Sequence, residues 1–165
     1  MSGPQILVAG IGNVFLGDDG FGVEVARRLG ERTLPHGVRV VDFGIRGFDL
    51  ALALLEPYDL VVLVDAARRG GKPGTLYLME VTERPERQVD FQTHSLVPSD
   101  VFGAVRAMGG MLPNLFVLAC EPEDFGDPDE GKMGLSQSVG AAIDEAIGMI
   151  ESLLRRTLAG HETHA

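Results

Sequence analysis

Two aspartates and one histidine that could bind a metal ion together lie far apart in this sequence of 165 residues. Asp19 follows an apolar segment at residues 5–9 after a glycine-rich turn, and Asp65 directly follows the apolar run at residues 60–64. His94 lies in a polar stretch further along the chain. Two carboxylates and one imidazole form a ligand set that suits Ni²⁺, Zn²⁺ or Mn²⁺ and leaves coordination positions open. The residue types therefore predict a divalent-metal site, provided that the fold brings them together.

The elements between these residues predict such a fold. Strands are expected at residues 5–9, 38–43, 60–64, 75–79 and 115–119, and helices at residues 20–29, 48–55, 99–108 and 135–158. The unbroken apolar run in the third strand is typical of a strand buried on both faces, as in a parallel sheet covered by helices. The fourth strand follows the third with no room for a crossover helix, so it is expected to run antiparallel. The pattern predicts one α/β domain, a three-layer α/β/α architecture with a five-stranded mixed, mostly parallel sheet.

The predicted topology places the two aspartates at one edge of the sheet. In open α/β sheets a crevice forms where the strand order reverses, here at the carboxyl ends of the first and third strands. Asp19 and Asp65 are expected to face each other across it. Two unpaired carboxylates repel each other, so a cation or a shared proton must relieve the repulsion. The loop that carries His94 could fold over the crevice and supply a third ligand.

Three acidic residues near the predicted crevice also have purely structural interpretations. Asp18 is interpreted as the N-cap of the first helix rather than as a ligand. Asp19, in the first turn of that helix, would complement the helix dipole even without a metal ion. Asp42 ends the second strand, where an acid that binds a ribose could lie. We interpret it as a loop or cap residue, because the dinucleotide-binding fingerprint is incomplete.

The turn after the first strand matches that fingerprint only in part. The fingerprint requires glycines at the first, third and sixth places of the turn. Gly10 and Gly12 fit, whereas Phe15 occupies the sixth place. Its bulky side chain is expected to prevent the close contact between helix and strand that a glycine permits. The two acids that follow also place negative charge where a pyrophosphate would bind, so the turn is predicted to hold a cation rather than a phosphate.

The remaining candidate reactive groups are expected to be structural. Cys120 ends the fifth strand with no histidine close in sequence to activate it, so it is interpreted as a buried thiol. Glu121 and Glu123 follow at the same edge of the sheet and would either line the crevice or be solvated. The two histidines of segment 159–165 lack the spacing that places both on one helical face, and this segment is expected to form a flexible tail.

Composition narrows the class of protein. The formal net charge of −10 argues against a nucleic acid as partner, because binding phosphates needs a basic surface. Hydrophobic residues make up 45% of the chain, enough for one domain over residues 1–165 with its own core. One cysteine allows no internal disulfide, which suits a reducing compartment. No leader or membrane-spanning segment is recognisable, so a cytoplasmic protein that binds no membrane is expected.

The order of these motifs resembles the maturation endopeptidases of [NiFe] hydrogenases. The first shared motif is Gly-Ile-Gly-Asn-Val-Phe-Leu-Gly-Asp-Asp-Gly-Phe-Gly, which starts at residue 10. The resemblance covers residues 5 to about 158. Further shared motifs lie at residues 42–47, 64–66, 93–94 and 120–122. It implies a five-stranded mixed sheet with one antiparallel strand, and it places the metal ligands of the family on Asp19, Asp65 and His94. Many members carry Gly-Thr-x-Gly where this chain has Ile45 and Arg46 between its glycines, which bears on the hydrogenase subgroup.

The resemblance also implies a function. It implies an endopeptidase that cuts a short C-terminal extension from the precursor of a hydrogenase large subunit after nickel insertion. The precursor would carry the Ni²⁺, and Asp19, Asp65 and His94 would be both metal-binding and catalytic residues; Zn²⁺ or Cd²⁺ could also occupy the site. A monomer suffices for this task. Two alternatives stay open: another hydrolase on a related scaffold, such as a peptidyl-tRNA hydrolase, and a non-catalytic nucleotide- or metal-binding domain.

Overall fold

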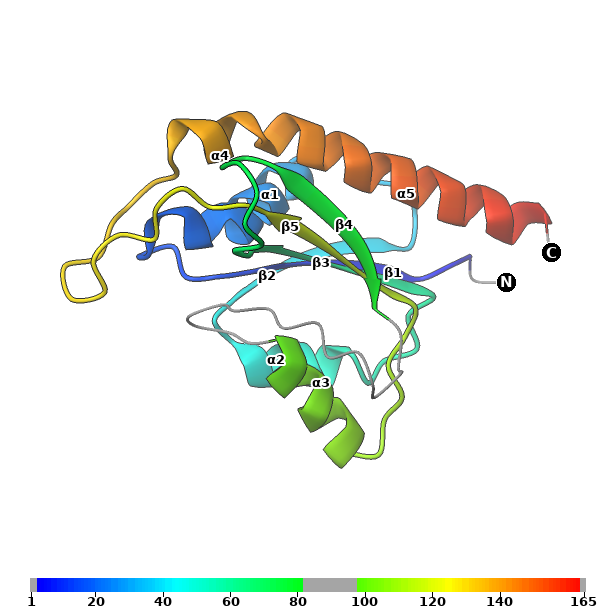
Figure 1. Cartoon of the computed structure of the whole chain (residues 1–165). Helices are drawn as coiled ribbons and strands as arrows, with labels where there is room; N and C mark the ends of the chain where they lie inside the picture. The colour runs from blue at the N-terminus through cyan, green and yellow to red at the C-terminus, as the bar shows by residue number, and fades with distance from the viewer. Residues whose placement is uncertain (1–2, 82–97, 164–165) are drawn as a thin grey trace.

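The computed structural model describes residues 3–81 and 98–163, which form a five-stranded sheet between two layers of helices (Figure 1). The strands are β1 (Ile6–Ile11), β2 (Val38–Gly44), β3 (Leu60–Ala66), β4 (Leu76–Val81) and β5 (Leu115–Cys120). Their order is β2-β1-β3-β5-β4, and neighbouring strands are parallel except for β4, which is antiparallel to β5. The predicted three-layer fold and its antiparallel strand are confirmed.

Helices cover both faces of the sheet (Figure 1). A 3-10 helix, η1 (Gly17–Gly20), leads into α1 (Phe21–Gly30), which lies on one face with α4 (Gln137–Ala141) and α5 (Ile143–Thr163). The other face carries α2 (Gly47–Ala53) and α3 (Pro98–Ala107). The single helix expected at residues 135–158 is two helices, separated at Ala142, and the second continues to Thr163. In the described part of the chain, no helix has both the length and the apolar character needed to cross a bilayer.

Strand β3 lies at the centre of the core, and all seven of its residues are buried. Successive side chains of a strand point to opposite faces of its sheet. Val62 and Val64 accordingly pack in the apolar cluster that includes α1 and α5, whereas Val61 and Leu63 pack in the cluster that includes α2 and α3. The continuous apolar run therefore reflects burial on both faces. The same burial extends to Asp65, which continues the strand.

Helix α1 packs directly on the backbone of β1 and β3 through two glycines. A Cβ atom on Gly22 would lie 2.0 Å from the carbonyl oxygen of Val64, and one on Gly10 would lie 2.3 Å from the carbonyl oxygen of Gly22. No side chain fits at either position. The expectation that Phe15 prevents this contact is wrong, because η1 separates Phe15 from the start of α1 and leaves it 64% exposed. Gly22 allows the close approach of helix and strand that the fingerprint assigns to its sixth place.

Candidate active site

Asp19 and Asp65, the acid pair, come together at the carboxyl edge of the sheet. Gly10 pairs with Val64 in the register of β1 and β3, so the turn after β1 adjoins the end of β3. Asp65 belongs to β3, and Asp19 lies in η1. Asp65 is 3% exposed and Asp19 is 2% exposed. The structure therefore places two of the three predicted site residues in one buried position.

Gly12 allows this close arrangement. Its φ of 138° lies in the region that side-chain-bearing residues rarely adopt. A Cβ atom on Gly12 would lie 1.9 Å from the main-chain oxygen of Asp19 and 3.8 Å from Oδ1 of Asp65. The backbone of Gly12 thus lies against the main chain of Asp19 and close to the carboxylate of Asp65. The next residue, Asn13, donates its main-chain N–H to Oδ2 of Asp19 at 2.9 Å, which holds that carboxylate at the turn.

The acid pair is electrostatically strained. Burial raises the pKa of the Asp65 carboxyl well above its ordinary value, and the nearby carboxylate of Asp19 raises it further. One hydrogen bond opposes these effects, because the main-chain N–H of Ala66 donates to Oδ1 of Asp65 at 2.8 Å and lowers the pKa. A proton on Asp65 or a cation between the two carboxylates would relieve the strain. The pair is therefore suited to binding a cation or to accepting a proton.

His94, the third predicted site residue, lies outside the described residues. Within residues 3–81 and 98–163, no three side chains of His, Cys, Asp or Glu form a group that could hold a metal ion. The two carboxylates of the acid pair suit a divalent cation by their chemistry, and they leave room in its coordination sphere for further ligands.

Asp18 is a buried anchor and not the N-cap of α1, so its predicted role is wrong. Its exposed fraction is 0%, and the N-cap position of α1 belongs to Gly20. Oδ2 accepts the main-chain N–H groups of Glu123 and Asp124 at 2.8 and 3.0 Å and the hydroxyl of Ser136 at 2.8 Å. Oδ1 accepts the main-chain N–H of Ser136 at 2.7 Å. These four hydrogen bonds, the Asp18 clamp, tie the loop between β5 and α4 to the turn after β1.

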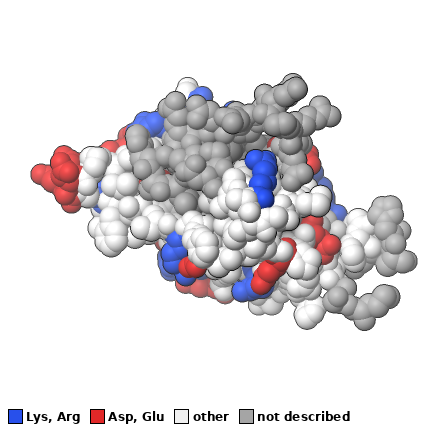
Figure 2. Space-filling model, turned by 90° about the horizontal axis from the view of Figure 1, so that it is seen from below, with Lys and Arg blue, Asp and Glu red and all other residues white. Residues whose placement is uncertain are grey.

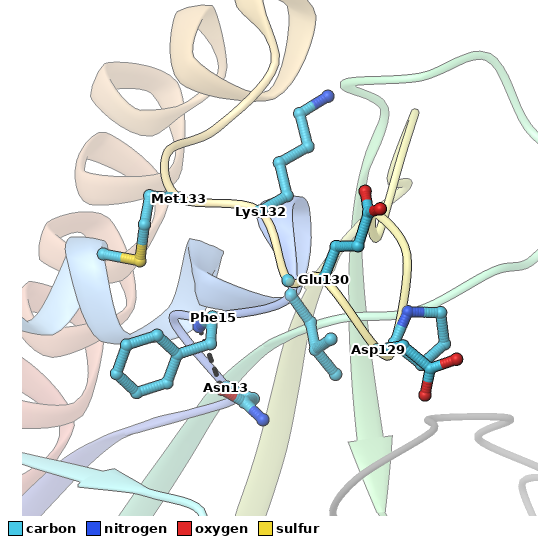
Figure 3. Close-up of a pocket in the computed structure, with 9 residues that line it drawn as sticks. Asn13, Phe15, Asp129, Glu130, Lys132 and Met133 are labelled. Atoms are coloured by element: carbon cyan, nitrogen blue, oxygen red, sulfur yellow. Dashed lines mark hydrogen bonds between the residues drawn. The ribbon is translucent and has the colours of Figure 1, made fainter.

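The turn and the clamped loop enclose a groove of about 380 Å³ beside the acid pair (Figure 3). Main-chain hydrogen bonds join them, from the N–H of Lys132 to the oxygen of Phe15 and from the N–H of Gly17 to the oxygen of Lys132, both at 2.8 Å. Asn13, Phe15 and Leu16 line one side, and residues 128–133 line the other. The groove was not predicted, because its two walls come from segments more than a hundred residues apart in the sequence.

Glu121 is buried inside the protein, so the expectation that it lines the crevice or is solvated is wrong. Its carboxylate accepts the main-chain N–H groups of Arg69 and Gly70 at 2.7 and 3.0 Å and the hydroxyl of Tyr77 at 3.3 Å. It therefore holds the connection between β3 and β4 against the end of β5. Glu123 is exposed and accepts the hydroxyl of Ser138 at 2.7 Å.

Asp42 lies within β2 and pairs with Gly10 in the register of the two strands, so it is neither a loop nor a cap residue. The loop that follows it carries the departure from the family pattern. Arg46 is the N-cap residue of α2, and its guanidinium donates to the main-chain oxygens of Asp42 and Phe43 at 2.5 and 3.2 Å. Ile45 is 58% exposed. Arg46 thus stabilises the loop to which it belongs. Ile45 adds an apolar side chain to the surface at this edge of the sheet.

The Cys120 thiol is expected to be nearly unreactive in the folded protein, as a buried structural residue should be. Burial raises its pKa to about 12, with further contributions from the Asp18 and Glu121 carboxylates. Because the thiolate is the reactive form, iodoacetamide should label the folded protein hardly faster at pH ~9 than at pH ~7, whereas labelling in denaturant should rise steeply. Mass spectrometry of the alkylated protein measures this. Equal rates in the folded and denatured states would contradict the assigned burial.

Charges of both signs are mixed on the face that carries α2 and α3 (Figure 2). Acidic side chains gather at the tip of the loop between β5 and α4, where Asp127, Asp129 and Glu130 are exposed. Lysine and arginine side chains on this face stand apart from one another. The described part of the face therefore lacks the continuous basic stripe that a nucleic-acid backbone requires.

Comparisons with known proteins agree on one family. A sequence profile described as hydrogenase maturation protease matches residues 23–153. A putative hydrogenase maturation protease of Methanocaldococcus jannaschii is 35% identical over 152 residues, which cover 91% of this chain and 96% of that protein. The hydrogenase 2 maturation protease of Escherichia coli is 30% identical over 156 residues, which cover 93% of this chain and 92% of that protein.

A solved structure shows that the fold is shared as well. The hydrogenase maturating endopeptidase HybD from Escherichia coli has a TM-score of 0.77 to this chain at 28% identity, and the match covers 93% of each chain. These findings do not favour the alternatives of a different hydrolase or a non-catalytic binding domain. Because the profile spans most of the sequence and the relatives align over nearly their whole length, this chain belongs to the hydrogenase maturation protease family and is a hydrolase.

Proposed function

We propose that this protein removes the C-terminal extension from the large-subunit precursor of a [NiFe] hydrogenase after nickel insertion. Membership of the family supports the reaction class, hydrolysis of a peptide bond. The nickel ion belongs to the precursor, and the enzyme recognises the precursor by it. Asp19, Asp65 and His94 complete the coordination sphere of that ion. The protein acts as a cytoplasmic monomer and binds neither nucleic acid nor membrane.

The acid pair is the observation that carries this proposal. Asp19 and Asp65 are almost fully buried, and their mutual repulsion adds to the cost of burial that raises the pKa of Asp65. A divalent cation presented by the precursor relieves both effects at once. A precursor without nickel offers no such compensation. The same two side chains therefore account for recognition of the loaded precursor and for rejection of the unloaded one.

Direct attack by water is the chemistry that these residues support. Cys120, the single cysteine of the sequence, is buried and has a raised pKa, which makes it a poor nucleophile. The oxygen of water bonds to the carbonyl carbon, the π electrons move onto the carbonyl oxygen, and a proton passes to a carboxylate oxygen of Asp19 or Asp65 that does not bind the ion. When the carbon–nitrogen bond breaks, the departing nitrogen takes up that proton and becomes the new amino terminus.

Cleavage of purified precursor in nickel-loaded and nickel-free forms tests the proposal. The wild-type enzyme is expected to cleave the loaded form alone. Asp19→Asn, Asp65→Asn and His94→Ala are each expected to lower kcat/KM by about 10²–10⁴-fold, the range typical of a lost proton-transfer group. Gel electrophoresis and mass spectrometry of the products give the rate and the cleaved bond.

Two exposed residues provide matched controls. Asp42 lies near the carboxyl end of β2, and His36 precedes that strand. Asp42→Asn and His36→Ala change the same chemical groups at residues outside the acid pair, so both variants are expected to cleave at the wild-type rate. Full activity in all three site variants would reject the site assignment. Equal cleavage of the two precursor forms would reject recognition through nickel.

A further inference from the structure

Asn13 lies between the acid pair and the groove, and three hydrogen bonds fix its position. Its main-chain N–H donates to Oδ2 of Asp19 at 2.9 Å, and its main-chain oxygen accepts the N–H of Leu16 at 3.1 Å. Its side-chain Oδ1 accepts the main-chain N–H of Phe15 at 2.9 Å. The last bond orients the carboxamide, because only its oxygen can accept. The nitrogen therefore faces away from the turn, as Figure 3 shows.

The NH₂ group of Asn13 is the part of this residue that the fold does not use. Within the described residues it donates no hydrogen bond, although the residue is half-buried and lines the groove. Phe15 and Met133, which are 64% and 69% exposed, line the same groove. The charged residues Asp129, Glu130 and Lys132 line it as well. Apolar side chains combined with a few fixed polar groups are typical of sites that hold a ligand in a set orientation. An extended peptide suits this site, since its backbone carbonyls are acceptors.

We infer that the carboxamide N–H of Asn13 donates a hydrogen bond to the carbonyl oxygen of the scissile peptide bond. The inference rests on the proposed function, because that function brings a peptide bond to the acid pair. The hydrogen bond from the main-chain N–H of Asn13 to the Asp19 carboxylate keeps the side-chain NH₂ group of Asn13 close to the acid pair, which takes part in hydrolysis. The hydrogen bond from Phe15 keeps the donor oriented before the substrate arrives. Asn13 is thus a catalytic residue in addition to the acid pair.

The role follows from where charge develops during hydrolysis. When the oxygen of water bonds to the carbonyl carbon, the π electrons move onto the carbonyl oxygen, and the proton of water passes to a carboxylate. A donor that is already in place stabilises this oxyanion more than the neutral carbonyl. When the intermediate collapses, the electron pair re-forms the carbonyl, the carbon–nitrogen bond breaks and the departing nitrogen takes up the proton. Asn13 donates throughout and exchanges no proton, so it should affect kcat more than KM.

Asn13→Ser and Asn13→Ala separate this role from the role of Asn13 in the turn. A serine hydroxyl can accept the N–H of Phe15 as the asparagine oxygen does, but it does not reach the position of the NH₂ group. Alanine can do neither. Both variants are expected to lower kcat for the nickel-loaded precursor by about 10²–10³-fold with KM little changed. The serine variant is expected to keep the melting temperature of the wild type.

The controls distinguish this inference from the proposed function. Asn114→Ser makes the same change at an exposed position before β5, at the opposite edge of the sheet, and should cleave normally. If Asn13→Ser cleaves at the wild-type rate while Asp19→Asn does not, the role of Asn13 is overturned and the proposed function stands. If Asn13→Ala loses activity and Asn13→Ser keeps it, the catalytic role of Asn13 is also overturned, because disruption of the turn would then explain the loss. Failure of the wild-type enzyme to cleave would overturn both.

Discussion

Asp65→Asn is expected to melt at a higher temperature than the wild-type protein and yet to lose cleavage of the nickel-loaded precursor. Burial, and then the Asp19 carboxylate, raise the pKa of Asp65. At neutral pH the folded protein must either keep this carboxylate charged or retain a proton that the unfolded chain releases, and both cost free energy of folding. Asparagine has a similar shape and no charge, and its oxygen can still accept the N–H of Ala66. The residue that the proposed hydrolysis needs is therefore one that folding disfavours.

The gain in stability from Asp65→Asn should depend on pH. An aspartate in an unfolded chain has a pKa of about 3.9, and the folded-state pKa of Asp65 is higher. Below the unfolded value the carboxyl is protonated in both states, and the wild type retains its full stability. As pH rises through the folded-state pKa, that stability is lost. The variant has no such group, so its advantage should be small at acidic pH and greatest at neutral pH.

Thermal unfolding of chelator-treated protein, followed by circular dichroism over this pH range, measures the effect. Asp42→Asn removes an exposed aspartate from the same edge of the sheet and should leave the melting temperature nearly unchanged. A variant at Asp65 that melts with the wild type at every pH, or below it at neutral pH, would show that the buried carboxylate is not under strain.

Asp18→Asn is expected to lower the free energy of unfolding by about 3 kcal/mol, a large part of the stability of a domain. All four partners in the Asp18 clamp are donors, and they come from Glu123, Asp124 and Ser136. A carboxylate offers two acceptor oxygens, whereas a carboxamide offers one, so at least one buried N–H would face another donor. Urea denaturation measures the change, which corresponds to a fall in melting temperature of roughly 6–12 °C.

Two further variants locate this effect in the clamp. Ser136→Ala keeps the main-chain donor but removes the hydroxyl, which also caps α4 by accepting the N–H of Val139 at 3.4 Å. It should therefore cost about 1–2 kcal/mol. Asp124→Asn breaks an exposed ion pair with Lys132 and keeps the main-chain donor, so its effect should be small. If Asp18→Asn were no less stable than Asp124→Asn, the clamp would not contribute to stability in the way that its geometry indicates.

The main features of the fold could be predicted because they depend on patterns within short segments. The apolar run at residues 60–64 predicts a strand buried on both faces, and the short connection after it predicts an antiparallel neighbour. Both are confirmed by β3 and β4. Gly22 was missed, because η1 lies between the turn and the helix and shifts the position at which a glycine is required. A short 3-10 helix has no apolar periodicity by which the sequence could reveal it.

The site could be predicted only where topology alone brings residues together. Asp19 follows β1 and Asp65 lies near the carboxyl end of β3, and these two strands are adjacent and parallel, so the proximity of the two residues follows from the strand order. Asp18 and Glu121 differ, because their partners are main-chain N–H groups in distant loops. Any residue other than proline can supply such a group, so the sequence contains no signal of the pairing. The orientation of the Asn13 side chain is likewise set by a hydrogen bond from the main-chain N–H of Phe15, which the sequence alone does not indicate.

The Asp18 clamp also joins segments that the ribosome makes at very different times. Its carboxylate emerges early from the ribosome, whereas Ser136, which supplies two of the four donors, is made only after most of the polypeptide. Until Ser136 is made, the clamp has only the two donors of Glu123 and Asp124. A chain cut before residue 136 is therefore expected to hold the loop between β5 and α4 less firmly against the turn after β1.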